Sequence, residues 1–212
     1  MVQTTRSVCG PMLGVAFFDD AGYDRNWAKS CIAFSDSVFQ YLKRTEGIER
    51  VILTGDFENF FEGRVIVRDA QGQLEVVRFD PKKAADAFLQ TIAKLREIGK
   101  RVVVVAPPPR ATFNVARCAE RVIEGLPVIQ SAPGCSISAP KYKRKHADLE
   151  DFLARVETQA DAAFVDLPAI LCDREKCRTI MDGIALYRDA GHLSYEGSRY
   201  IFTHFPAASV IR

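Results

Sequence analysis

Three short apolar runs rich in β-branched residues recur along the chain. They are Arg50–Thr54 (RVILT), Arg101–Ala106 (RVVVVA) and Ala163–Leu167 (AFVDL). Strands that are buried on both faces have this composition, because helices cover both sides of a parallel sheet. The runs therefore predict three buried parallel strands, whose C-terminal ends would carry functional loops.

Segments with apolar residues three and four positions apart separate these runs. Asp24 can cap a helix that continues to about Arg44, and Pro81 begins a second helix that continues to about Ile98. Helical spacing also predicts a helix over Asp148–Gln159 and a short one before Gly125. Helices that alternate with apolar strands predict a doubly wound α/β layer fold.

Two segments depart from this alternation. Arg64–Phe79 alternates around Gln71-Gly72, which predicts a β-hairpin inserted at about residues 64–79. Residues 1–23 have no regular period, and only Val2–Thr5 is expected to form a short strand there.

Composition places the chain among ordinary globular proteins. Of its 212 residues, 48% are hydrophobic and 26% charged, and the net charge is +2. This charge does not indicate a nucleic-acid partner, and no apolar run has the roughly twenty residues of a membrane span. The basic run Lys141–Lys145 is interpreted as a solvated face, with contact to an acidic polysaccharide or lipid headgroups as the alternative.

Six cysteines are present, without the spacing of a zinc site. Cys172 and Cys177 enclose four residues of a polar loop and are expected to form a disulfide, which indicates an oxidising compartment. Unpaired buried cysteines in a cytosolic protein are the alternative.

The segment Tyr187–Ser198 (YRDAGHLSYEGS) carries the candidate chemistry. Asp189 precedes His192, one of three histidines, by three residues. At this spacing the carboxylate can bind one imidazole nitrogen and leave the other available as a base. Ser194 is expected to cap a short final helix. By itself the spacing favours a structural pair over a catalytic one.

Asp-x-x-His near the C-terminus resembles the last motif of the SGNH/GDSL hydrolase superfamily. The longer string LYRDAGHLSYEGS is more specifically similar to the SGNH domain attached to family 3 membrane acyltransferases, which O-acetylate cell-surface polysaccharides. The loop with Cys9 and Pro11, the helix with Cys31 and Phe34, and the strands VILTG and VVVVAPPP are also similar.

The resemblance implies a three-layer α/β sandwich with a mostly parallel sheet, SGNH-hydrolase-like and flavodoxin-like. It implies a periplasmic or extracytoplasmic location as part of a membrane protein, which favours disulfides. It also implies serine-dependent acyl transfer with His192 as base and Asp189 as its orienting partner, an attached membrane acyltransferase domain and a sugar or polysaccharide acceptor. No metal, cofactor or nucleic acid is implied.

The sequence departs from this family pattern at two places. It contains no Gly-Asp-Ser, the motif that supplies the nucleophile, so residues 1–212 are expected to be a single SGNH-like domain that lacks the first strand. After VILTG stands Asp56-Phe57, where the family 3 domains usually have Arg-Trp. Gly55 and Asn59 are the candidate oxyanion and substrate contacts.

Three hypotheses follow from the sequence. The first is an O-acetyltransferase or esterase whose serine lies upstream of Met1. The second is a non-catalytic relative with a carbohydrate-binding or structural role. The third is a metal site formed by Asp189, His192 and His204, which ranks last because His204 stands among aromatic residues and is expected to pack against them.

Overall fold

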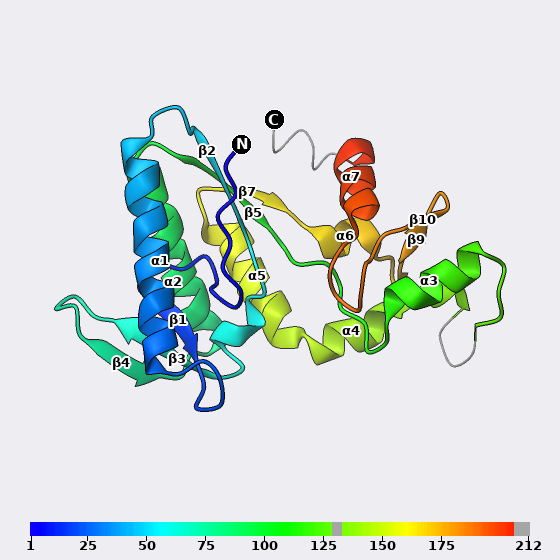
Figure 1. The fold of residues 1–212 in the computed structure, drawn as a ribbon, viewed down its shortest axis with the longest axis horizontal. Helices are drawn as coiled ribbons and strands as arrows, with labels where there is room; N and C mark the ends of the chain where they lie inside the picture. The colour runs from blue at the N-terminus through cyan, green and yellow to red at the C-terminus, as the bar shows by residue number, and fades with distance from the viewer. Residues whose placement is uncertain (129–132, 206–212) are drawn as a thin grey trace. The chain divides into compact units, whose positions relative to one another are not determined.

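A computed structural model describes residues 1–128 and 133–205. The chain divides into two compact units, one formed by residues 1–104 and 148–164 and the other by residues 105–147 and 165–212. Figure 1 shows the elements, coloured in their order along the chain.

A parallel sheet with strand order β2-β5-β7 confirms the predicted fold class. Its strands are β2 (Arg50–Thr54), β5 (Arg101–Val105) and β7 (Ala163–Val165). All three were predicted from their apolar runs, and the last ends two residues earlier than expected because Asp166 caps the next helix by accepting a hydrogen bond from the Ala169 amide.

The long helices begin and end close to their predicted limits. They are α1 (Arg25–Arg44), α2 (Pro81–Glu97) and α5 (Ala147–Gln159). The Asp24 carboxylate accepts a hydrogen bond from the Trp27 amide, and Asp80 does the same for Lys83, so both caps compensate unpaired amides of the first turn.

An antiparallel sheet with strand order β1-β3-β4 contains the predicted hairpin. Strands β3 (Arg64–Arg68) and β4 (Leu74–Val77) pair with Val65 opposite Val77. The first strand, β1 (Val15–Phe18), pairs antiparallel with β3. The expectation for residues 1–23 was therefore wrong at this strand, and Val2–Thr5 forms no strand.

Two clusters form the apolar core of the first unit. In the first, Cys31 and Ile32 of α1 pack on Ala16, Phe18 and Ile66 of the antiparallel sheet. In the second, the rings of Phe57, Phe88 and Phe152 lie with centroids 5.1–5.8 Å apart and are fully buried, which ties α2 and α5 to the segment after β2.

The second unit consists of short elements held by disulfides and turns. Its helices are α3 (Val115–Ile123), α4 (Ala139–Lys145), α6 (Leu167–Leu171) and α7 (Tyr195–His204). Its two-residue strands are β6 (Ile137–Ser138), β8 (Lys176–Cys177), β9 (Ile180–Met181) and β10 (Ile184–Ala185). The short 3-10 helices are η1 (Glu58–Phe60) in the first unit and η2 (Pro133–Cys135) in the second.

Strands β9 and β10 form a hairpin around Asp182-Gly183. Both turn residues have positive φ, 48° and 75°, which is the backbone that a tight two-residue hairpin turn requires. This hairpin lies directly before the candidate segment and sets the direction in which the chain enters it.

All six cysteines are paired. Cys9–Cys31 lies in the first unit, and Cys118–Cys135 and Cys172–Cys177 lie in the second. The expected Cys172–Cys177 bond is therefore present.

The basic run lies on α4, where Lys141 and Lys143–Lys145 are exposed while Tyr142 is buried. The run is therefore exposed to solvent, and the choice between a solvated face and contact with an acidic polysaccharide or lipid headgroups stays a prediction.

Within residues 1–128 and 133–205, no helix is both long enough and apolar enough for a membrane crossing.

Candidate functional site

The loop that contains Asp189 and His192 is fixed by backbone hydrogen bonds on both sides. The Arg188 amide donates to the His192 carbonyl over 2.9 Å, and the Ser194 amide donates to the Leu186 carbonyl over 2.8 Å. Tyr187 and Leu186 are fully buried and anchor the strand side of the loop. The loop is thus a short closed turn between two fixed ends.

Ser194 caps α7, as the sequence predicted. Its hydroxyl accepts a hydrogen bond from the Gly197 amide over 2.8 Å and donates to the Ala185 carbonyl over 2.7 Å. Gly197 is required here, because a Cβ at this position would lie 2.3 Å from the Leu186 carbonyl oxygen. The first turn of α7 therefore lies directly against the backbone that leads into the candidate site.

The Asp189 carboxylate makes hydrogen bonds with the backbone and the imidazole of its own loop. Its Oδ1 accepts hydrogen bonds from the amides of Gly191 and His192, each over 2.8 Å. Its Oδ2 lies 2.8 Å from Nδ1 of the His192 ring. The hydrogen bond expected from the Asp-x-x-His spacing is therefore present, whereas the catalytic role of the pair stays a prediction.

Electrostatics keep this carboxylate ionised. Partial desolvation raises the pKa of Asp189, but hydrogen bonds from Gly191, from the His192 amide and from the His192 ring outweigh it and lower the pKa to about 2. An ionised carboxylate can only accept a hydrogen bond, so Nδ1 carries the hydrogen that is donated to it. Nε2 of the neutral ring then has a lone pair available. The His192 side chain is 64% exposed, so a reactant can approach it.

A second loop packs against residues 190 and 191, between Asp189 and His192, and the sequence assigned no role to it. The Ala111 amide donates to the Ala190 carbonyl over 2.8 Å, and a Cβ on Gly191 would come within 3.0 Å of the Arg110 Nε. The guanidinium of Arg110 thus lies beside the loop of His192. Its position after Pro107–Pro109 at the end of a strand was the only sequence signal.

The candidate oxyanion contacts belong to the other unit. Gly55 follows β2 directly, and Asn59 lies on η1. The Gly55 backbone approaches Pro11, whose Cδ would lie 3.3 Å from an added Cβ. Their role as oxyanion donors stays a prediction.

His204 contacts an aromatic ring, as the sequence led us to expect, but it is exposed and its ring contact is with Tyr200. Its ring stacks on Tyr200 with centroids 4.3 Å apart, and its Nδ1 lies 2.9 Å from the Tyr200 carbonyl oxygen. Among the residues that the structure describes, no group of three or more His, Cys, Asp or Glu side chains could hold a metal ion.

Comparison with known proteins gives the chain its class. The sequence matches the family model of the SGNH domain fused to AT3 domains over residues 1–207. The chain belongs to this family of SGNH domains, and the family and fold support an SGNH-type acyl-transfer role.

A solved structure shares the fold. It is the periplasmic domain of a lipopolysaccharide acetyltransferase from Salmonella ser. Paratyphi A, with a TM-score of 0.54 and 19% sequence identity. The match covers 86% of this chain and 64% of that chain, so this chain spans less than two thirds of its neighbour. Among curated proteins, none matches the sequence.

Proposed function

We propose that Asp189 and His192 are the acid–base half of a serine-dependent acyl-transfer site, and that the chain is an O-acetyltransferase or esterase domain. One observation carries the proposal, namely the ionised Asp189 carboxylate 2.8 Å from Nδ1 of an exposed imidazole. This geometry holds Nδ1 against Asp189 and leaves Nε2 available as a base. The carboxylate also stabilises the imidazolium that forms when the ring takes a proton.

In the proposed reaction His192 takes the proton of a serine hydroxyl as the oxygen attacks an acyl carbonyl. The resulting tetrahedral oxyanion is held by the Gly55 amide and the Asn59 side-chain amide. His192 then returns the proton to the leaving group, and an acyl-serine remains. In the second half, His192 takes the proton of a sugar hydroxyl in the transferase, or of water in the esterase, as that oxygen attacks the carbonyl of the acyl-serine. The bond to the serine oxygen then breaks, His192 gives its proton to that oxygen, and the acylated sugar or the free acid leaves.

The serine is proposed to come from residues that precede Met1 in a longer chain, since the 212 residues contain no Gly-Asp-Ser. The acyl acceptor is proposed to be a cell-surface polysaccharide, and an attached membrane acyltransferase would supply the acetyl group. Fusion to such domains is the arrangement of the family, and disulfides form in oxidising compartments such as the periplasm.

The second candidate is a non-catalytic relative that binds carbohydrate. The absence of Gly-Asp-Ser from the 212 residues favours this candidate if no serine is supplied from elsewhere. The Asp189–His192 contact would then serve only to hold the loop.

Labelling with a serine-reactive fluorophosphonate separates the two candidates. A chain extended upstream to include the Gly-Asp-Ser segment should be labelled at that serine, and His192→Ala should abolish labelling. His204→Ala is the matched control, because it removes another exposed imidazole of the same unit without touching Asp189. An extended, folded chain that is not labelled but binds polysaccharide would support the non-catalytic candidate instead.

A further inference from the structure

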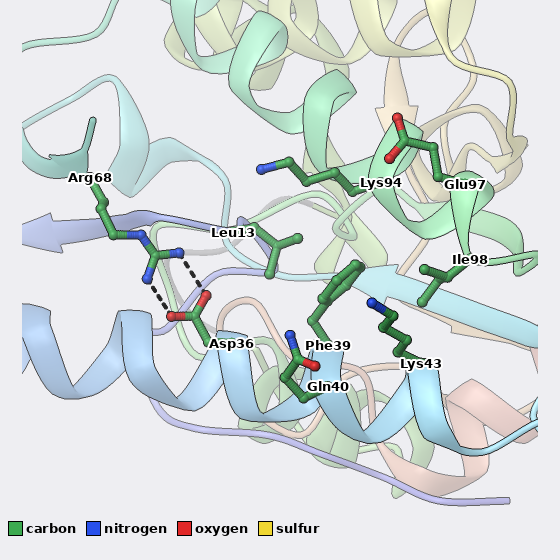
Figure 2. Close-up of a pocket in the computed structure, with 9 residues that line it drawn as sticks. All are labelled: Leu13, Asp36, Phe39, Gln40, Lys43, Arg68, Lys94, Glu97 and Ile98. Atoms are coloured by element: carbon green, nitrogen blue, oxygen red, sulfur yellow. Dashed lines mark hydrogen bonds and ion pairs between the residues drawn. The ribbon is translucent and has the colours of Figure 1, made fainter. Parts of the chain in front are cut away.

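A cavity in the first unit lies far along the chain from the Asp189–His192 pair. It has a volume of about 390 Å³, and α1 and α2 contribute most of its lining. The lining residues are Leu13, Asp36, Phe39, Gln40, Lys43, Arg68, Lys94, Glu97 and Ile98 (Figure 2).

One wall of this cavity is a fixed ion pair. The Arg68 guanidinium donates two hydrogen bonds to Asp36, one of them over 2.8 Å, and Figure 2 shows both groups facing each other. Hydrogen bonding to Asp36 raises the pKa of Arg68, so the guanidinium stays charged. Since the two opposite charges are paired, this wall is rigid and adds no net charge to the cavity.

The floor of the cavity is also held in place. The Leu13 amide donates to the Thr91 hydroxyl of α2 over 3.0 Å, and the Arg68 amide donates to the Gly14 carbonyl over 2.8 Å. The loop that carries Leu13 is therefore tied to both α2 and β3. Such pre-formed sites avoid the cost of ordering a loop when a ligand binds.

Two ammonium groups in the lining lack partners. Within residues 1–128 and 133–205, Lys43 on α1 and Lys94 on α2 make no hydrogen bond or ion pair with the protein. Both side chains are exposed, and they reach the cavity from two different helices. Only Glu97 among the lining carboxylates remains to oppose them, because Asp36 is committed to Arg68.

Between these charges lie apolar groups and an amide. Phe39 is half-buried and points from α1 into the cavity, with Ile98 also lining it, while Gln40 offers a donor and an acceptor. A flat apolar ring with an adjacent amide fits the C–H face and the hydroxyls of a sugar ring. The unpartnered ammonium groups fit a carboxylate or phosphate on that ring.

We infer that this cavity is a binding site for an acidic sugar unit, one that carries a carboxylate or a phosphate ester. Phe39 contacts the ring, and the ammonium groups of Lys43 and Lys94, which lie on different sides of the cavity in Figure 2, attract the anionic group by their charge. A second cavity of about 510 Å³ shares Leu13, Arg68 and Lys94, which provides room for a neighbouring unit of an oligosaccharide. The site binds the sugar whether or not the proposed acyl transfer takes place.

The test is an NMR shift titration of the 212-residue chain with glucuronate, glucose 1-phosphate, glucose and inorganic phosphate. Both acidic sugars should shift signals of α1 and α2 in a saturable way, inorganic phosphate should bind more weakly, and neutral glucose should not bind. Added salt should weaken binding, because the cavity is open to solvent.

Variants test each group separately. Lys43→Gln with Lys94→Gln should weaken binding of both acidic sugars about tenfold, because hydrogen bonds to charged groups are the strong ones. Glu97→Gln should tighten binding, and Phe39→Leu should weaken binding of the sugars but not of phosphate. Lys29→Gln with Lys143→Gln removes the same charge from exposed lysines outside the cavity and should have no effect.

Three results would overturn the inference. They are equal affinity in the two double variants, glucose binding as tightly as glucuronate, and inorganic phosphate binding as tightly as glucose 1-phosphate. All four substituted residues in the double variants are exposed, so unchanged thermal unfolding should verify that the fold is intact.

Discussion

Asp189 holds His192 at two points, since its Oδ1 accepts the backbone amide and its Oδ2 lies 2.8 Å from the ring Nδ1. One carboxylate therefore fixes both the path of the loop and the orientation of the imidazole. Loss of its charge should loosen both together.

The first prediction concerns the pH dependence of this loop. The folded-state pKa of Asp189, about 2, is lower than its ordinary value of 3.8, so its contribution to stability is present above the ordinary value and is lost as pH falls toward 2. The carboxyl carbon shift of Asp189 in an NMR titration should therefore show a midpoint near pH 2. In Asp189→Asn the amide signals of Gly191 and His192 should lose their dependence on acid pH. A midpoint near 4 would contradict the hydrogen bonding described here.

The second prediction concerns the disulfides of the second unit. Alkylation without reductant should label no cysteine, and mass spectrometry checks this directly. Loss of Cys118–Cys135, which closes a separation of 17 residues, should destabilise the unit by about 1 kcal/mol more than loss of Cys172–Cys177, which closes 5. Paired Cys→Ser variants in a denaturant titration measure the difference. Labelling of Cys172 and Cys177 without reductant would contradict the pairing.

The sequence predicted the elements whose signals are local. The cap Asp24, Pro81 at the start of the second helix and the helical spacing after each placed α1 and α2 within a residue or so. Strand β1 was missed because its four residues have no clear alternation, and it forms only by pairing with β3, about 50 residues away.

In the candidate site, too, the local contact could be predicted from the sequence and the long-range contacts could not. The contact of Asp189 with His192 spans three residues and could be predicted from spacing. The approach of Arg110 to Gly191 could not, because it depends on how two distant loops pack. The proposed roles of Gly55 and Asn59 depend on chain contacts of the same long-range kind and remain predictions.

The third prediction concerns Gly197. Its replacement by Ala adds a Cβ 2.3 Å from the Leu186 carbonyl oxygen, so α7 must shift, at a cost of about 1–3 kcal/mol despite the better helix propensity of Ala. Gly22→Ala is the control, because an added Cβ there meets no atom within 4 Å. Chemical denaturation of both variants measures the difference. Equal stability would show that α7 does not lie against Leu186 in this way.

The fourth prediction concerns the Tyr187 hydroxyl, which is buried without a hydrogen-bond partner in the part of the chain that the structure describes. Burial raises the pKa of Tyr187, so the hydroxyl stays protonated and uncharged. Tyr187→Phe should be neutral or stabilise the protein by up to about 1 kcal/mol, because an unpaired polar group is removed. Tyr200→Phe should instead be mildly destabilising, because that hydroxyl donates to Asp182. Destabilisation by Tyr187→Phe in thermal unfolding would show that its hydroxyl has a partner.

The fifth prediction concerns catalysis by the chain itself. A triad without its nucleophile loses about as much activity as one without any of its three groups, because the groups act as a unit. The 212-residue chain should therefore hydrolyse an activated acetyl ester barely faster than buffer, and His192→Ala should change that rate little.

The most direct test compares ester hydrolysis by four chains, the 212-residue chain and the extended chain with the upstream serine, each with and without His192. We predict that only the extended chain with His192 is active, with a rate several orders of magnitude above the others, on the order of the effect of a complete triad. Asp189→Asn in the extended chain should remove much of this rate through the wrong tautomer. Substantial His192-dependent turnover by the 212-residue chain, or no gain in the extended chain, would contradict the account.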